Sequence, residues 1–104
     1  MGVPVSARPN FGGTMEKQWV LYILECGDGT LYTGITDDLT RRLKAHSQGK
    51  GAKYTRGRGP LKLRYVESCA DHSAALKLEY RMKQLSRAQK LVLIEEKGII
   101  EEIN

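Results

Sequence analysis

The stretch that decides the fold runs from Trp19 to His46 and reads WVLYILECGDGTLYTGITDDLTRRLKAH. Residues 19–26 are almost continuously apolar, and so short a run is typical of a strand that is buried on both faces. The turn Gly27-Asp28-Gly29 follows, and glycine adopts positive φ without steric cost. The sequence therefore predicts an antiparallel hairpin whose second strand covers residues 31–36.

A helix is predicted immediately after this hairpin. Asp37 or Asp38 can serve as its N-cap, because a short carboxylate accepts hydrogen bonds from the free backbone N–H groups of the first turn. Leu39 and Leu43 are four residues apart, so they share one face and are expected to pack against the sheet. Residues 47–49 end this helix.

The next element is a third strand over residues 61–67. Leu61, Leu63 and Tyr65 alternate there with Lys62 and Arg64. Such alternation predicts that the apolar side chains share one face and that the other face is turned toward solvent.

Two helices complete the pattern. The first opens at Asp71 and reaches about Leu85, and Ser86 with Gln89 then forms a capping box for a second helix that reaches about Lys97. The apolar stripe of the first consists of Ala75, Leu78, Met82 and Leu85. We therefore predict an α+β fold of the broad α/β class, a three-stranded antiparallel sheet flanked by helices in the order strand, strand, helix, strand, helix, helix.

Length and composition limit the organisation and the partners. A chain of 104 residues holds one domain, which we place at residues 16–97, after a disordered leader (1–15) and before a tail (98–104). The net charge of +5 favours a polyanionic partner such as nucleic acid. There is no membrane-spanning run and no signal-peptide pattern, so we expect a cytoplasmic monomer without a membrane partner.

Several enzyme classes lack their motifs. The sequence contains no Walker loop, GxSxG elbow, HExxH or GxGxxG pattern. Cys26 and Cys69 form no CxxC pair, which speaks against a cysteine zinc site.

Glu79 is the first candidate functional residue, because it falls within the apolar stripe of its helix. A carboxylate there needs a partner, since a buried unpaired charge costs several kcal/mol. One interpretation is an ion pair with an arginine such as Arg42. The other is a ligand for a hard cation such as Mg²⁺, which can be held by one carboxylate together with waters and a substrate phosphate.

Four side chains of the hairpin and its helix could act on a phosphodiester. Tyr22 and Tyr32 lie at comparable points of the paired strands, so their hydroxyls could share a face, although a strand tyrosine is most often simply a packed aromatic. Arg42 could neutralise a phosphate, and His46, one turn further on, could relay a proton. A lone helix histidine is, however, more often a solvated surface residue.

The segment Gly49 to Pro60, GKGAKYTRGRGP, is a basic glycine-rich loop. Such a loop can follow a phosphate backbone while an aromatic side chain stacks on a base. The alternative is a solvated turn without a ligand. The predicted nucleic-acid-binding residues of this loop are Lys50, Lys53, Tyr54, Arg56 and Arg58.

Taken together, these residues resemble the GIY-YIG domain, and specifically its small single-domain bacterial branch of uncharacterised proteins. The first half-motif corresponds to VLYIL at residues 20–24 and the second to LYTG at residues 31–34. Arg42, His46, the basic loop and the helix around Glu79 extend the similarity over about residues 17–97.

The resemblance implies a GIY-YIG-like fold and assigns roles by position. Tyr22 and Tyr32 correspond to the motif tyrosines, one of which serves as base or positions the attacking water. Arg42 corresponds to the arginine that contacts the scissile phosphate, and Glu79 to the single carboxylate that holds one divalent cation, Mg²⁺ or Mn²⁺. His46 stands where many members have tyrosine and some nucleases have histidine, so it could share the proton transfer.

The sequence also departs from the family pattern. Leu21 occupies the place of the first motif's glycine, Thr33 replaces an apolar residue, and Ile35 stands where DNA-repair members carry a lysine. These differences leave the choice of target open.

The resulting hypothesis is a metal-dependent endonuclease that hydrolyses phosphodiesters of DNA during repair or processing. A separate targeting protein could act as its partner. The alternative is a non-catalytic module that binds DNA or RNA on the same fold, with DNA favoured. A third interpretation is a protein-interaction domain with a vestigial site.

Overall fold

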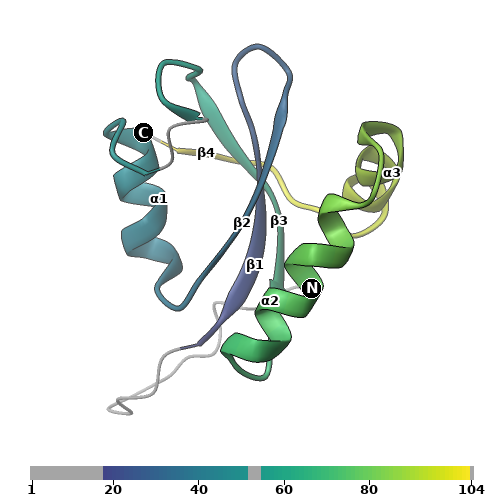
Figure 1. The fold of residues 1–104 in the computed structure, drawn as a ribbon. Coiled ribbons are helices and arrows are strands. Elements are labelled where there is room, and N and C mark those ends of the chain that lie inside the picture. The colour runs from purple at the N-terminus through teal and green to yellow at the C-terminus, as the bar shows by residue number, and fades with distance from the viewer. Residues whose placement is uncertain (1–17, 52–54, 104) are drawn as a thin grey trace.

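The computed structural model describes residues 18–51 and 55–103 of the chain. Its strands form one antiparallel sheet in the order β2-β1-β3-β4, with α1 on one face and α2 and α3 on the other (Figure 1). This arrangement confirms the predicted α+β class with an antiparallel sheet and flanking helices. The elements are β1 (Val20–Glu25), β2 (Leu31–Thr36), α1 (Leu39–Ser47), β3 (Leu61–Ser68), α2 (His72–Lys83), α3 (Arg87–Lys97) and β4 (Glu101–Ile103).

The sheet has four strands, which corrects the prediction of three. The additional strand β4 lies within the segment 98–104 that we expected to be a tail, and it pairs with residues 61–63 of β3. The backbone N–H of Ile99 donates to the carbonyl of Arg64 at 2.8 Å and directs the chain back to the sheet. A three-residue strand is too short to show a periodic pattern, so sequence alone could not reveal it. The predicted leader at residues 1–15 lies outside the described residues.

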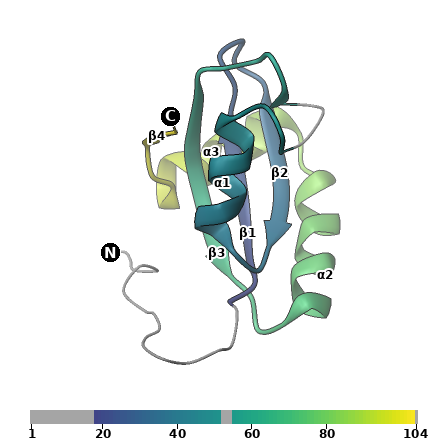
Figure 2. The same ribbon diagram turned by 90° about the vertical axis from the view of Figure 1, so that its left-hand side faces the viewer.

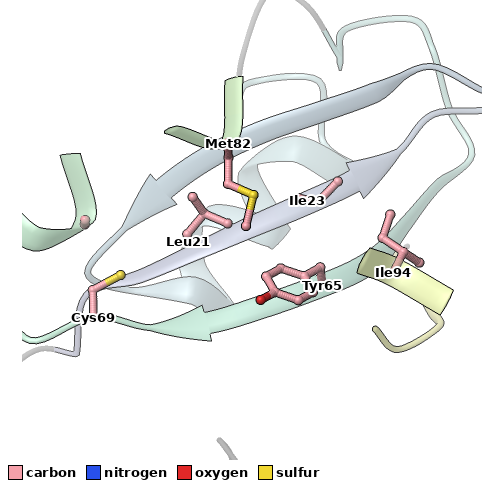
Figure 3. Packing of buried hydrophobic residues seen from close by; sticks show 7 residues of the cluster. Leu21, Ile23, Tyr65, Cys69, Met82 and Ile94 are labelled. Carbon is pink, nitrogen blue, oxygen red and sulfur yellow. The ribbon is translucent and has the colours of Figure 1, made fainter. Parts of the chain in front are cut away.

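The central strand β1 is buried on both faces, as predicted. Leu21 and Ile23 point toward α2 and α3, where they pack with Met82 and Ile94 (Figure 3). Tyr22 and Leu24 point the opposite way, toward α1. Adjacent residues of one strand therefore belong to two separate cores, because successive side chains alternate across a sheet.

Strand β3 does not keep the single apolar face that its sequence predicts. Ile23 pairs with Tyr65 whereas Leu24 pairs with Leu63, so Arg64 is an extra residue and forms a β-bulge. Leu63 consequently faces α1, while Tyr65 faces α2 and α3. The bulge lets β3 supply apolar side chains to both cores, and the prediction that these side chains share one face was wrong.

The helix starts follow local capping chemistry. The Asp38 side chain accepts a hydrogen bond from the backbone N–H of Arg41, and Asp71 caps α2 in the same way. Both hydrogen bonds of the predicted capping box between Ser86 and Gln89 are present. No helix in the described part of the chain is both long enough and apolar enough to span a bilayer.

Candidate active site

Tyr22 lies at the centre of a hydrogen-bonded cluster on the α1 face of the sheet. Its side chain is completely buried, and its ring crosses the neighbouring strand at Gly34, its partner residue on β2. A Cβ atom at Gly34 would lie 2.6 Å from the Tyr22 hydroxyl, which is closer than real Cβ contacts allow. The glycine of the second half-motif is therefore needed to make room for the tyrosine of the first.

Arg42 and His46 lie one turn apart on α1 and both contact the Tyr22 hydroxyl. The His46 Nε2 atom is 2.9 Å from this oxygen, and Arg42 Nε donates to it over 3.4 Å. His46 is only 2% exposed. The alternative that it is a solvated surface histidine is therefore wrong. The side chains of Arg42 and His46 therefore meet at the Tyr22 hydroxyl.

Tyr32 completes the cluster from the edge strand β2. Its ring centroid lies 6.2 Å from that of Tyr22 and 5.4 Å from that of His46. In contrast to these two buried residues, Tyr32 and Arg42 are half-buried. Water or a substrate can therefore reach Tyr32 and Arg42, whereas Tyr22 and His46 lie behind them.

Burial sets the charge states of the cluster. Desolvation raises the pKa of Tyr22 to about 12, although the hydrogen bond from Arg42 opposes this shift. Desolvation, aided by the positive charge of Arg42, lowers the pKa of His46 to about 4. At neutral pH the cluster thus contains a neutral phenol, a neutral imidazole and one guanidinium cation.

Thr55 is a member of this site that the sequence did not single out. Its Oγ1 atom lies 2.9 Å from His46 Nδ1, and both side chains are buried. Gly51 passes so close to the His46 ring that a Cβ atom there would collide with it. The basic loop is therefore attached to the buried side of the cluster. A threonine within a glycine-rich loop carries no local signal of such a contact, so only tertiary structure could reveal it.

Glu79 is not part of the hydrogen-bonded cluster. It lies on α2, which runs beside β2 (Figure 2), and its Oε2 atom is 3.2 Å from Lys83 Nζ on the same helix. The ion pair with Arg42 that we considered is therefore not formed, and Lys83 takes that place. The Glu79 side chain is 23% exposed, so it reaches solvent near the edge of the sheet.

The basic loop is only partly described. Lys50 and Arg56 are exposed, while Lys53 and Tyr54 lie outside the described residues. Arg58 forms an ion pair with Asp28 of the hairpin turn at 2.6 Å. This pair gives Arg58 a role in holding the loop against the turn, in addition to the predicted contact with nucleic acid.

Comparison with known families identifies the domain. The model of the GIY-YIG catalytic domain matches residues 18–92, most of the chain. The chain belongs to the GIY-YIG family. The predicted resemblance is therefore confirmed, and the matched region contains both half-motif tyrosines together with Arg42, His46 and Glu79.

Several proteins similar to this chain carry the name UPF0213. One from Oceanobacillus iheyensis is 54% identical over 81 residues, which cover 78% of this chain and 94% of that protein. One from Halobacterium salinarum is 58% identical over 73 residues, 70% of this chain and 95% of that protein. The solution NMR structure of a UPF0213 protein from Bacillus halodurans is 49% identical and covers 78% of this chain and 86% of that one, with a TM-score of 0.53. A second NMR structure, of an E. faecalis protein, is 38% identical in sequence and has a TM-score of 0.56. The match covers 79% of this chain and 90% of that one.

GIY-YIG nucleases generally depend on a divalent metal ion, and the side chains near Glu79 can be tested for such a site. Among residues 18–51 and 55–103, no group of three or more His, Cys, Asp or Glu side chains could enclose a metal. A closed protein cage is therefore not available. The half-buried carboxylate of Glu79 fits Mg²⁺, which keeps several waters and needs only one or two carboxylates together with substrate phosphate.

Proposed function

We propose that this protein is a metal-dependent endonuclease that hydrolyses phosphodiester bonds of nucleic acid, with DNA as the favoured substrate. The observation that supports this most strongly is that Arg42 and His46 both contact the Tyr22 hydroxyl. A second tyrosine, Tyr32, lies beside them at the edge of the sheet. A packed core has no need of a guanidinium directed at a buried phenol. A phosphate-handling site does, because the planar cation can neutralise charge that develops on the phosphate.

The two tyrosines have different parts in this proposal. Tyr22 is completely buried and its pKa is raised to about 12, so it holds its proton and cannot touch an attacking water. Tyr32 is half-buried and faces the same cluster, so it is the tyrosine placed to accept a proton from the attacking water or to orient it. Tyr22 and His46 then position Tyr32 and Arg42 from behind.

Glu79 is the residue that would hold Mg²⁺ or Mn²⁺ at the open edge of the sheet. When bound, the metal supplies Lewis-acid stabilisation of the leaving oxygen. The carboxylate has to be shared with Lys83 or released by it. A solvent-accessible pair four residues apart on a helix contributes only about 0.5 kcal/mol, so a cation together with a substrate phosphate can replace it.

The decisive experiment is cleavage of a panel of labelled single-stranded, duplex and branched DNAs and RNAs, with Mg²⁺ or Mn²⁺ and with EDTA. We expect metal-dependent products from the wild type and a loss of at least ~100-fold with Glu79→Ala, because the proposed metal ligand is removed. Glu95→Ala is the matched control, since Glu95 is an exposed carboxylate on α3. Full activity of Glu79→Ala, with thermal stability equal to that of the control, would contradict the metal assignment.

A second candidate is a non-catalytic module that binds DNA or RNA. The pairing of Glu79 with Lys83 favours it, because it leaves the carboxylate engaged by the protein itself. Exposed Lys50 and Arg56 serve both candidates equally. Salt-sensitive binding of the same substrates without any product, in either metal, would favour this module over the nuclease.

A further inference from the structure

The edge strand β2 presents two consecutive side chains to opposite faces of the sheet. Tyr32 faces α1 and contacts the rings of Tyr22 and His46. The next residue, Thr33, pairs with Ile23 and therefore faces α2 and α3. In the described sheet β2 has a neighbouring strand on one side only, so a ligand that passes around this edge can contact both faces.

On the second face, Thr33 contacts a lysine that sequence analysis did not single out. Lys90 of α3 places its Nζ atom 3.4 Å from Thr33 Oγ1, and the Lys90 side chain is half-buried. No carboxylate of the described residues lies within ion-pair distance of this ammonium group. A half-buried cation held by a neutral hydroxyl alone is poorly compensated.

The charge of a second lysine, Lys83, also acts on Lys90. Burial lowers the pKa of Lys90, and the positive charge of Lys83 lowers it further. Lys83 in turn pairs with the carboxylate of Glu79 at 3.2 Å. Glu79, Lys83 and Lys90 together thus carry a net charge of +1 next to the β2 edge, and an anion placed there would relieve the repulsion between the lysines.

We propose that Lys90 and Lys83 form a phosphate-binding site for a nucleic-acid backbone that crosses the β2 edge. Arg42 and Tyr32 then contact one phosphate on the α1 face, and the two lysines contact a nearby phosphate on the α2 and α3 face. This inference rests on the proposed function, because it takes Arg42 and Tyr32 as the reacting side. A nucleic acid bound in this way would pass both Tyr32 and Glu79, although these residues lie on opposite faces of the sheet.

The structural alternative is that the Lys90 stem covers apolar surface while its ammonium group finds the nearest hydroxyl. Lys90→Met separates the two, because methionine keeps an unbranched apolar stem and removes the charge. The matched control is Lys97→Met, since Lys97 is an exposed lysine at the end of the same helix. Lys90→Arg tests whether charge alone restores binding.

The experiment is fluorescence anisotropy of a labelled single strand and of the same sequence as a duplex, titrated in EDTA at several KCl concentrations. We expect the slope of log Kd against log[KCl] to fall by about 0.7 on single strands and about 0.9 on duplex for Lys90→Met, the increment for one lost phosphate contact. Lys97→Met should retain the wild-type slope, Lys90→Arg should recover it, and Lys83→Met should lower it similarly.

The outcomes separate this inference from the proposed nuclease activity. A lowered slope without cleavage by the wild type would support the phosphate site and contradict the nuclease. Cleavage by the wild type with equal slopes for Lys90→Met and Lys97→Met would overturn the phosphate site alone. Failure of the wild type to bind either nucleic acid would overturn it as well.

Discussion

At the scale of single residues, exposure separates roles that the sequence leaves equal. Tyr22 and Tyr32 occupy equivalent places in the two half-motifs, yet Tyr22 is fully buried and Tyr32 is not. His46 is buried too, and its two ring nitrogens have different partners, Tyr22 and Thr55. A neutral imidazole donates at one nitrogen and accepts at the other, so it can connect these two hydroxyls without carrying charge.

The burial of neutral His46 predicts a pH dependence of stability. Its pKa is lowered from 6.5 to about 4, so between these values the unfolded chain binds a proton that the folded protein excludes. Stability from this group is complete above pH 6.5 and is lost as the pH falls toward 4. The loss should be on the order of 3 kcal/mol, since the pKa is lowered by about 2.5 units and one unit corresponds to about 1.4 kcal/mol.

The measurement is urea unfolding of wild type and His46→Gln at intervals from pH 8 to pH 4. The difference in unfolding free energy between the two proteins should be constant above pH 6.5 and should shrink below it. A difference that stays constant down to pH 4 would mean that His46 is not held neutral by the fold.

At the scale of elements, side chains of the loop between α1 and β3 attach it both to α1 and to the hairpin turn. The hydroxyl of Thr55 contacts His46 on α1, and Arg58 pairs with Asp28 in the hairpin turn. These contacts connect the predicted nucleic-acid-binding loop to the buried side of the candidate site. The bulge at Arg64 is a second element-level feature, because it allows β3 to contribute to both cores.

Thr55→Val should disturb the site without changing the fold. Valine has a similar shape but no hydroxyl, so His46 Nδ1 loses its described partner, at a cost of about 1–3 kcal/mol for an unsatisfied buried group. We expect cleavage to fall about tenfold or more, because the orientation of His46 toward Tyr22 is no longer fixed. Single-turnover cleavage and urea unfolding of the variant measure the two effects.

Thr55→Ser is the control, because it restores the hydroxyl, and it should recover most of the activity. Long-range ¹H–¹⁵N NMR spectra of the His46 ring provide a readout that is independent of cleavage. Identical ring nitrogen shifts in wild type and Thr55→Val would show that this threonine does not position the histidine.

At the scale of the whole molecule, one sheet separates two hydrophobic cores, and only one of them borders the candidate site. The core on the α2 and α3 face is mainly aliphatic (Figure 3), whereas the core on the α1 face contains Tyr22 and borders the candidate site. Strand β4 extends the sheet on the side opposite β2, and its Ile103 packs against the α1-face core. The far edge of the sheet thus stabilises the core that supports the site.

Ile103→Ala tests whether packing of β4 contributes to the stability of the fold. Removing three methyl or methylene groups from a partly buried position should lower the unfolding free energy by about 1–2 kcal/mol. Ile100→Ala is the matched control, since Ile100 is 70% exposed and its truncation should change stability little. Equal urea midpoints for the two variants would show that β4 contributes nothing through packing.

The sequence by itself determined those features that depend on neighbouring residues. The hairpin follows from an apolar run and a glycine turn, and the tyrosines share a face because strand side chains alternate. The caps at Asp71 and Ser86 follow from the sequence too, whereas for α1 the structure selects Asp38 from the two aspartates that the sequence offers. The family could be predicted as well, because its motifs are short and local. In each case the physical cause acts over a few residues, so a pattern in the sequence records it.

Tertiary structure alone decided which distant side chains meet. Nothing local distinguishes Thr55 from other loop threonines or Lys90 from other helix lysines. The three-residue strand β4 and the bulge at Arg64 likewise depend on pairing with β3 and β1. Such contacts depend on how elements pack in three dimensions, and packing joins residues whose separation in the chain leaves no periodic signal.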